Sequence, residues 1–497
     1  MDGDGVYSWL CSFINLERGL GGVPSRNGLE EHFKLSRIRA LADLAGNPER
    51  GAPVIHIAGS KGKGSVTAMI ASILEEGGIK TARYMSPHVS DWRERISRGK
   101  GDPFPEEVYR EAGRELVEVY NNYGASRGPG PNPPDPGEPT FFELLTLYFF
   151  LCARGDSRRF MVVETGLGGR LDATNIVDPL VSVITPIEKE HTGYLGETLE
   201  AIAGEKGGII KRGRPVISAE QDPRVLGVLR RLAEERAAPF FYLPELTETG
   251  VTRIHPGGTD FTLTETAPPG FPGAGPRTLA LSVPGPGAFQ ARNAALAIRA
   301  VQTALAVQDS PAAAPPGAGE TAAPRRLDGE TARRGLGAFS LPARFEKVRE
   351  NPVLIIDGAH TPRSAELCAE TFRGLYGGGG ILLFGCAADK DAASMAAILV
   401  PGFSRIIVTA PGAFRASDPA GVYRAFQAAA GKGGNPPAAA PPELTLIPSA
   451  PAALEEALRL GGERALPILA CGSFYLAAEI RKTPPRLLIS KTNKRWY

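Results

Sequence analysis

The chain has 497 residues, and its 56 Lys and Arg against 54 Asp and Glu give a formal net charge of +2. The length favours two domains of ordinary size over one, and the balanced charge gives no reason to expect a nucleic acid or an anionic membrane as a partner. Five cysteines without a C-x-x-C pair argue against a disulfide framework and against a zinc site.

Two further features bear on the compartment. The N-terminus, Met1-Asp2-Gly3-Asp4-Gly5, is acidic, which is atypical of a secretory signal. The longest apolar stretch, residues 144–153, lies between Glu143 and Arg154. It is too short to cross a bilayer and predicts a core helix. We therefore expect a soluble, cytoplasmic protein.

Residues 54–65 combine a strand with a glycine-rich loop. The apolar run 54–58 predicts a buried strand, and the loop Gly59-Ser60-Lys61-Gly62-Lys63-Gly64-Ser65 follows it directly. A helix is predicted from Val66 onward, because apolar residues recur there with the spacing of one helical face. Gly77-Gly78 is expected to end that helix.

Such a strand, loop and helix N-terminus make an anion site, because backbone N–H groups and the positive end of the helix dipole point at one spot. Lys63 would place a cation on the β- and γ-phosphates of a nucleotide, and Ser65 could reach a magnesium ion. The loop departs from the pattern G-x-x-x-x-G-K-[ST], since Gly64 follows Lys63 and delays the hydroxyl by one residue. The alternative is a surface turn rich in glycine and lysine. The flanking strand and helix favour the nucleotide site.

Strand-like runs alternate with helical patterns along the rest of the chain, and this predicts an α/β fold with a mainly parallel sheet. These runs are 81–85, 160–163, 181–185, 216–218, 353–356, 381–384, 406–409 and 468–470. An Ala/Pro/Gly-rich segment, residues 311–324, interrupts the series. We place the domain boundary near Leu341, which gives domains of residues 1–340 and 341–497. The tracts 127–139, 267–276 and 431–442 are interpreted as loop expansions.

Glu164 ends the run 160–163 and leads into Thr165-Gly166-Leu167-Gly168-Gly169-Arg170-Leu171-Asp172. Parallel sheets bind their ligands at the carboxyl ends of their strands, and a glutamate beside a triphosphate can hold Mg²⁺. A dinucleotide fingerprint fails here, because leucine stands at position 171 where a third glycine is needed. A strand-end glutamate with a purely structural role stays open.

His191 follows the run 181–185, and neighbouring strands would bring it over the glycine loop. A lone loop histidine is, however, more often simply solvated. Lys206 is expected on a helix surface on sequence physics alone, and Ser86, after the run 81–85, could offer a hydroxyl to a metal. A structural role is the expectation for the remaining histidines considered, which are His32, His56, His88 and His255.

In the second half, Asp357 ends the run 353–356 and Arg344 stands at the start of the domain. Arg344 could reach a phosphate across an interdomain cleft, and Asp357 could hold ribose hydroxyls. A hinge arginine and a helix N-cap aspartate are equally good interpretations.

Taken together, these segments resemble the folylpolyglutamate synthase/dihydrofolate synthase family, a branch of the Mur ligase superfamily. The glycine-lysine loop, the run ETGLGGRLDATN at 164–175 and the spacing of His191 and Lys206 carry the resemblance jointly. Further matching blocks are Ser86-Pro87-His88, Glu94-Arg95-Ile96, Phe142-Glu143, Leu195 to Leu199, Glu205 to Lys211, Gln290 with Asn293, Arg344 with Glu346, and Asp357 to Pro362.

The resemblance implies a P-loop ATPase domain of the Mur ligase type and a smaller, Rossmann-like C-terminal domain. It also implies roles for single residues. Gly62, Lys63, Gly64 and Ser65 would form the ATP loop, and Asn293, Arg344 and Asp357 would also bind ATP. Ser86, Glu164 and His191 would ligate Mg²⁺, of which two ions are expected. Lys63, Lys206 and His191 are the catalytic candidates, and Lys206 matches a lysine that becomes carbamylated in this family.

Four positions depart from the family pattern. Lys61 replaces an asparagine, Glu190 replaces an aspartate, Ala343 replaces a glycine and Thr361 replaces an asparagine. The Glu190 and Thr361 changes put the geometry around the ligands in doubt. The insert at 127–139 is expected to reshape the pterin pocket.

The implied activity is ATP-dependent ligation of L-glutamate to dihydropteroate or a reduced folate through an acyl phosphate. The enzyme is expected to be a monomer that binds neither nucleic acid nor a membrane. Two rivals stay open, which are another Mur-type amino-acid ligase and a P-loop NTPase that is not a ligase. The sequence does not choose between the two pterin acceptors.

Overall fold

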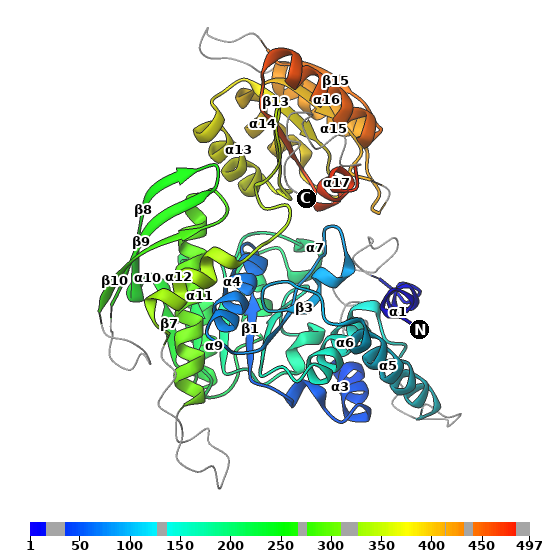
Figure 1. Cartoon of the computed structure of the whole chain (residues 1–497), viewed down its shortest axis with the longest axis vertical. Helices are drawn as coiled ribbons and strands as arrows, with labels where there is room; N and C mark the ends of the chain where they lie inside the picture. Colours follow the sequence, from blue (N-terminus) through cyan, green and yellow to red (C-terminus); the bar gives the residue numbers. More distant parts are fainter. Residues whose placement is uncertain are drawn as a thin grey trace.

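The computed structural model describes residues 1–15, 35–126, 137–266, 276–309, 327–412, 414–431 and 441–483. Within these residues, the named strands form three sheets, of seven, three and six strands. Figure 1 shows the C-terminal part, which holds the six-stranded sheet, stacked on the N-terminal part, which holds the other two. The tracts 267–276, 311–324, 127–139 and 431–442 and His32 lie wholly or mostly outside the described residues.

The seven-stranded sheet has the order β3-β2-β4-β1-β5-β6-β7, and only β3 runs antiparallel to its neighbour. Its strands are β1 (Val54–Ala58), β2 (Thr81–Tyr84), β3 (Ile96–Arg98), β4 (Phe160–Glu164), β5 (Val181–Ile184), β6 (Val216–Ser218) and β7 (Phe240–Tyr242). β1 lies between β4 and β5, and all three are buried along their whole length. The carboxyl end of β1 therefore faces the residues that follow β4 and β5.

Helices cover both faces of this sheet, because each face carries its own apolar cluster. One face packs against α4 (Lys63–Glu76), α11 (Ala288–Gln308) and α12 (Gly329–Ala338). The other packs against α1 (Gly3–Leu10), α3 (Leu35–Leu44), α5 (Glu106–Ser126) and α6 (Phe141–Gly155). The remaining elements here are α7 (Thr192–Leu195), α8 (Leu199–Gly207), α9 (Pro223–Glu235), α10 (Leu243–Leu246) and the 3-10 turns η2 (Pro48–Arg50), η3 (Trp92–Glu94) and η4 (Ala173–Ile176).

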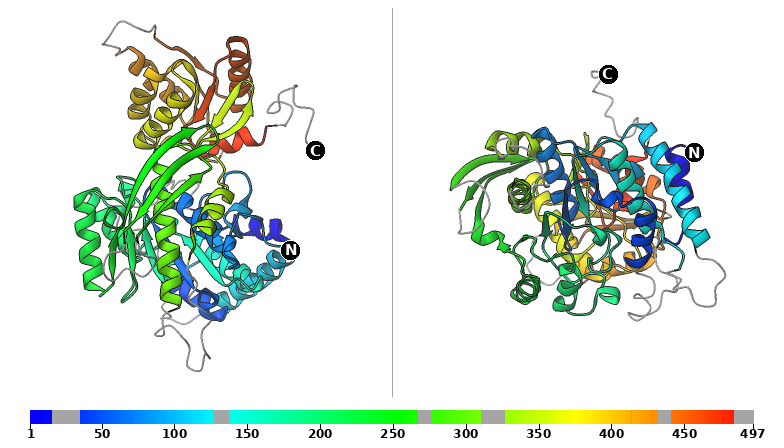
Figure 2. Two further views of the ribbon diagram at one scale, coloured as in Figure 1. Left: turned by 60° about the vertical axis from the view of Figure 1, so that its left-hand side comes forward. Right: turned by 90° about the horizontal axis from the view of Figure 1, so that it is seen from below.

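A three-stranded antiparallel sheet stands beside α11 and extends towards the C-terminal domain (Figure 2). Its strands are β8 (Thr247–His255), β9 (Gly258–Glu265) and β10 (Arg277–Val283). Glu265 at its end pairs with Arg299 of α11 at 3.5 Å, and both side chains are fully buried. This sheet is absent from the sequence-based expectation, because β8 is mostly exposed and carries no apolar run.

The six-stranded sheet has the order β11-β12-β16-β13-β14-β15, with only β11 antiparallel to its neighbour. Its strands are β11 (Glu346–Glu350), β12 (Val353–Ile356), β13 (Gly380–Phe384), β14 (Phe403–Val408), β15 (Glu443–Leu446) and β16 (Ile468–Cys471). Its helices are α13 (Pro362–Tyr376), α14 (Ala392–Leu399), α15 (Pro419–Gly431), α16 (Ala450–Arg464), α17 (Phe474–Arg481) and the turn η6 (Val400–Gly402).

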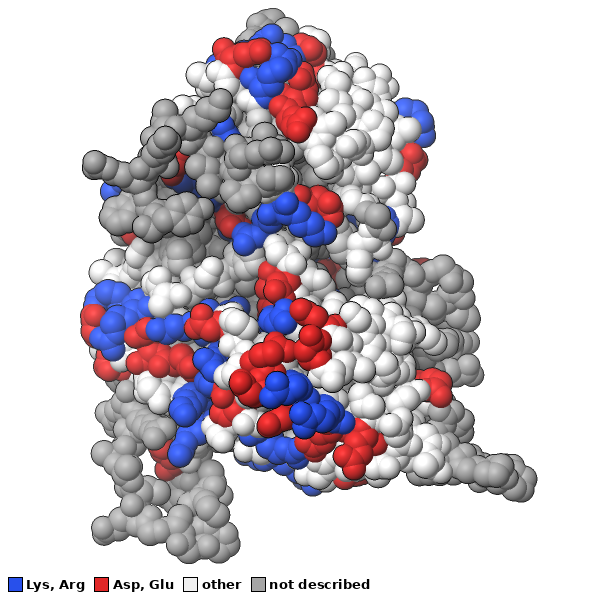
Figure 3. All heavy atoms as spheres, turned by 45° about the vertical axis from the view of Figure 1, so that its right-hand side comes forward, with Lys and Arg blue, Asp and Glu red and all other residues white. Residues whose placement is uncertain are grey.

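This two-part α/β architecture agrees with the predicted fold class, and the predicted strands agree with the observed ones to within a few residues. The stretch 144–153 lies in α6, a buried helix, as expected. No helix among the described residues combines the length and apolar character that crossing a bilayer requires. On the face shown in Figure 3, acidic and basic side chains are intermixed, without a large area of one sign.

Candidate active site

A cavity of about 1020 Å³ lies between the two parts of the chain and is lined by residues of both. The carboxyl ends of β1, β4 and β5 reach it from one side, and the residues after β12, β13 and β16 reach it from the other. Every residue predicted for the site lines this cavity, namely Gly62, Lys63, Gly64, Ser65, Ser86, Glu164, His191, Lys206, Asn293, Arg344 and Asp357. The fold thus brings together groups that are up to about 300 positions apart in sequence.

The glycine loop presents a helix N-terminus to this cavity. Val66 is the first residue whose amide bonds back to the loop, at 2.9 Å from the Gly62 carbonyl oxygen. The amides of the three residues before it are therefore the orphan donors that a helix start leaves for a ligand. Gly62 has a φ of +85°, and a Cβ there would lie 2.8 Å from the Asn293 Oδ1 atom. Only glycine fits this turn, which also places Asn293 directly against the loop.

The Gly59 carbonyl oxygen accepts hydrogen bonds from two lysine ammonium groups. Lys63 donates to it at 3.0 Å and Lys206 at 2.7 Å. Lys206 is only 2% exposed, so the expectation of a helix-surface lysine is wrong. Burial, partly offset by Glu190, lowers the pKa of Lys206 to about 8.

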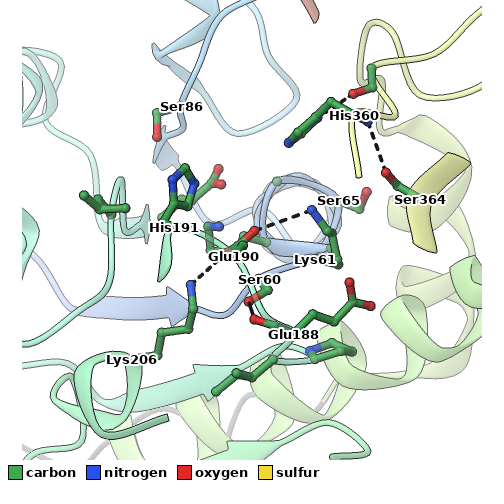
Figure 4. Close-up of a pocket in the computed structure, with 18 of the residues that line it drawn as sticks. Ser60, Lys61, Ser65, Ser86, Glu188, Glu190, His191, Lys206, His360 and Ser364 are labelled. Carbon is green, nitrogen blue, oxygen red and sulfur yellow. Dashed lines mark hydrogen bonds and ion pairs between the residues drawn. The ribbon is translucent and has the colours of Figure 1, made fainter. Parts of the chain in front are cut away.

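Glu190 bridges two lysines in the same cluster (Figure 4). One of its oxygens lies 3.0 Å from Nζ of Lys206, and the other lies 3.5 Å from Nζ of Lys61. Burial alone would raise the pKa of Glu190, but the surrounding lysines hold it below its usual range. The carboxylate therefore stays ionised and fixes both ammonium groups beside the loop.

Glu164 is a buried carboxylate with a free acceptor. It is 3% exposed, and its Oε2 atom has no hydrogen-bond partner within the described residues. Burial, opposed by Lys63 and Arg344, raises its pKa to about 7. A buried carboxylate oxygen without a partner is costly, which is the situation that a bound cation relieves.

Ser86 and His191 both line the same cavity as Glu164, and Figure 4 shows these two side chains on one side of it. The Ser86 backbone N–H interacts with the carboxylate of Glu164 and favours its ionised form. The His191 ring is exposed to the cavity, but its walls desolvate the ring and lower its pKa to about 4. The imidazole is therefore neutral near pH 7 and keeps a lone pair for a ligand.

Arg344 and Asp357 enter from the C-terminal part. Arg344 stacks on the Phe474 ring at 4.1 Å, and its guanidinium reaches within 3.7 Å of the place where a Cβ on Gly64 would lie. The Asp357 carboxylate accepts the amides of Phe345 and Ala359, both at 2.7 Å. The N-cap of α13 is Thr361 and not Asp357, so the N-cap interpretation of this aspartate is wrong.

Sequence reasoning missed a group of cavity residues on the C-terminal side. They are His360, Arg363, Ser364, Lys390, Arg415 and Ser473. Lys390 and Arg415 share the Asp389 carboxylate, at 3.3 and 3.6 Å. Their position is the signal that could have found them, because Asp389-Lys390 lies beyond the carboxyl end of β13 just as His191 lies beyond that of β5.

The comparisons with known proteins now decide the family. Residues 343–474 match the Mur ligase, glutamate ligase domain. The dihydrofolate synthase/folylpolyglutamate synthase of Mycobacterium tuberculosis is 36% identical over 404 residues, covering 77% of this chain and 75% of that protein. The chain belongs to the folylpolyglutamate synthase/dihydrofolate synthase family.

Solved structures of this family superpose on the whole fold. Mycobacterium tuberculosis folylpolyglutamate synthase complexed with ADP has a TM-score of 0.76 and 28% identity, and the match covers 97% of this chain and 98% of that one. An FPGS–AMPPCP–folate complex has a TM-score of 0.74 and 26% identity, with coverage of 97% and 99%. Membership of this ligase family favours a ligase over the NTPase that the sequence left open.

The structure shows how the chain accommodates three of the positions that depart from the family pattern. Thr361 caps α13 through its side chain in a reciprocal pair with Ser364, so the cap is kept without asparagine. Lys61 uses its longer chain to meet Glu190. Ala343 has a φ of +54°, which costs an alanine about 1 kcal/mol relative to glycine.

Proposed function

We propose that the protein joins L-glutamate to a carboxylate of a pterin substrate with ATP, through an acyl phosphate, and releases ADP and phosphate. It would act as a tetrahydrofolylpolyglutamate synthase, a dihydrofolate synthase, or both. The observation that carries the proposal is the single cavity in which Lys63 and Glu164 of one domain meet Arg344 and Asp357 of the other. Family membership supports it, since the relatives bear the names of these two activities.

The first step transfers the γ-phosphoryl group of ATP to the acceptor carboxylate. A carboxylate oxygen forms a bond to the γ-phosphorus while the bond to the β–γ bridging oxygen breaks. Lys63 and the amides at the start of α4 neutralise charge on the transferring group, and this positioning of charge is where catalysis of phosphoryl transfer mostly lies. Lys63 donates to the Gly59 carbonyl at 3.0 Å, and its ammonium group has two further N–H donors for phosphate oxygens.

The residues present fit a magnesium ion. Glu164 offers a buried oxygen without a partner, and Ser86 and His191 face the same space. No cluster of three His, Cys, Asp or Glu side chains able to hold a metal occurs in the described part of the chain. That agrees with a Mg²⁺ site that nucleotide phosphates and water complete. Bound there, the ion would neutralise phosphate charge, and a second ion stays a prediction.

The second step joins the amine of L-glutamate to the acyl carbon. The new C–N bond forms, the C–O bond to phosphate breaks, and the amine loses a proton. We assign the glutamate carboxylates to Lys390 and Arg415, because these cations line the cavity on the C-terminal side. His360 donates from Nδ1 to the Gly358 carbonyl at 2.7 Å, so its Nε2 can accept a hydrogen bond from the amine.

The pterin end of the acceptor is assigned to the part of the cavity beside α6. Thr140, Phe142, Leu171 and Ala173 line it there. The Asp172 carboxylate shapes this wall by accepting the amides of Gly166 and Leu167, both at 2.9 Å. Apolar and aromatic walls with a few polar groups suit a planar heterocycle.

Carbamylation of Lys206 stays a prediction. A pKa of about 8 leaves some neutral amine near pH 7, which addition of CO₂ requires. The carbamate would, however, carry its negative charge next to Glu190, so that Glu190 must give up its contact with Lys206. Intact-protein mass with and without bicarbonate tests this, since modification adds the mass of one CO₂.

The deciding experiment incubates the purified protein with ATP, magnesium and labelled L-glutamate, and offers dihydropteroate and tetrahydrofolate in separate reactions. We expect label to enter at least one pterin product, with one ADP formed per glutamate added. ADP release that ignores both glutamate and pterin would reject the proposal. The two acceptors compared side by side assign the activity as one, the other or both.

A further inference from the structure

The loop after β2 contacts the C-terminal domain directly. Val89 packs into the apolar cluster on one face of the six-stranded sheet. The Ser90 hydroxyl accepts a hydrogen bond from Nε of Arg481 at 2.9 Å, across a sequence separation of 391. Arg481 is the last residue of α17. The loop that carries Ser86 is therefore held by the domain that carries Arg344.

Arg481 also reaches the connection between the domains. Its Nη1 atom donates to Oε1 of Glu346, and Oε2 of Glu346 accepts the amide of Ala343 at 2.8 Å. Ala343 directly precedes Arg344, whose guanidinium stacks on Phe474 at the start of α17. One side chain thus links the Ser86 loop to the turn that aims Arg344.

Glu94 fixes the backbone of the loop segment that makes this contact. Its carboxylate accepts the amides of Val89, Ser90 and Asp91 at 2.6, 3.0 and 3.2 Å. Three backbone bonds to one carboxylate hold the loop in a single shape. A displacement of Ser90 would therefore move residues 89–91 together, and Ser86 lies only three positions before this segment.

The loop after β2 and the connection between the domains also enclose one side of the Glu164 carboxylate. A second cavity, of about 20 Å³, lies between the loop and the interdomain connection and is lined by Arg83, Glu94, Glu164 and Arg344, among others. This volume holds about one water molecule. Arg83 Nη1 and Glu164 Oε2, both buried, have no hydrogen-bond partner within the described residues. The closed loop therefore separates the Glu164 carboxylate from bulk solvent on that side.

We propose that Arg481 is a positioning residue, which holds Ser90 and Glu346 together and so keeps Ser86 and Arg344 on the same nucleotide. The inference rests on the proposed function, because MgATP is the ligand that the closed arrangement serves. Arg481 is partly exposed, and pairs of this kind are individually weak. Its effect is therefore on the balance between open and closed arrangements and is moderate in size.

The kinetic test measures three variants, which are Arg481→Ala, Ser90→Ala and the double variant that carries both changes. Each is compared with Lys482→Ala. Lys482, the next residue along, pairs with Glu479 at 2.9 Å within the same region of α17 and serves as the control. We expect Arg481→Ala to raise KM for MgATP about 5-fold and to change kcat less than about 2-fold, since saturating ligand restores closure. Arg481→Lys should recover part of the loss. The double variant should be no worse than Arg481→Ala, because both changes remove one linked contact.

Hydrogen exchange of the ligand-free protein gives a readout that does not depend on catalysis. We expect Arg481→Ala to speed exchange in peptides that contain the loop 86–91 and the connection 341–346, and to leave those of β13 and β14 unchanged. Exchange and KM equal to those of Lys482→Ala would overturn the proposal, as would independent, additive effects of Ser90→Ala and Arg481→Ala. A wild-type enzyme that ignores glutamate would instead reject the proposed function, and the exchange result would still decide the role of Arg481.

Discussion

The two halves of the cavity are built differently. On the N-terminal side the charged groups are buried and bonded to one another, and Lys206 and Glu164 are 2% and 3% exposed. On the C-terminal side the cations are more exposed, and the side chains of Lys390, Arg415 and Arg363 are 18%, 22% and 51% exposed. Both halves nevertheless use the carboxyl ends of parallel strands.

This difference suits the two steps of the proposed reaction. Phosphoryl transfer needs fixed charges around a compact transition state, so that preorganisation contributes most. Capture of an amino acid needs charge complementarity and a surface that can adjust as the domains close. We therefore expect changes in the first half to act on kcat and changes in the second half to act on the KM for glutamate.

The largest effect is expected for Lys63→Ala. Loss of the ammonium group leaves the charge on the transferring phosphoryl group without its protein counter-ion, and glutamate-dependent ADP release should fall by roughly 1000-fold or more. The control is Lys189→Ala, an exposed lysine in the segment after β5, the strand that pairs with β1. Near-normal turnover by Lys63→Ala would contradict the role of the glycine loop.

A smaller effect, confined to one substrate, is expected for Lys390→Ala. Removal of one cation that faces the glutamate carboxylates should raise KM for glutamate by about 10- to 100-fold, in line with a charge-assisted hydrogen bond. Affinity for an ATP analogue should stay unchanged. Steady-state kinetics with glutamate varied provide the measurement, and Lys347→Ala on β11 is the matched control. A loss in kcat alone would erase the distinction between the two halves.

The smallest expected effect is on the stability of the N-terminal half and not on catalysis. His56 lies in β1 below the loop, fully buried, with Nε2 at 2.8 Å from the Thr174 hydroxyl. Burial first, and Lys211 second, lower its pKa to about 3 from 6.5. The unfolded chain therefore binds one more proton between these values, so that this stability is present above pH 6.5 and is lost as pH falls towards 3.

The His56→Gln variant tests this linkage. The difference in free energy of unfolding between wild type and variant should change by up to about 1.4 kcal/mol per pH unit inside that window. Denaturant titrations at several pH values measure it, and His255→Gln on β8 serves as the control. A difference that does not vary with pH more than that of the control counts against a buried neutral histidine under the loop.

The sequence predicted the elements whose physics is local. The segment 54–76 could be read correctly because an apolar strand, a glycine turn and an amphipathic helix each have their own signal. Burial of Lys206 could not, because it depends on the Gly59 carbonyl, 147 positions away, and on Glu190, 16 positions away. Strand β8 was missed because it is mostly exposed and carries no apolar alternation. The signal was present in the other two strands and was overlooked, since apolar residues alternate at Phe261 and Leu263 in β9 and at 279, 281 and 283 in β10.

The central claim is that residues of both domains hold one nucleotide, and its most direct test is the affinity for a non-hydrolysable ATP analogue. Calorimetry would compare wild type with Lys63→Ala from one domain and Arg344→Met and Asp357→Asn from the other. The account predicts that each variant binds the analogue roughly 10-fold or more weakly, while Lys347→Ala binds it as wild type does. Wild-type affinity in both C-terminal variants would contradict the shared site.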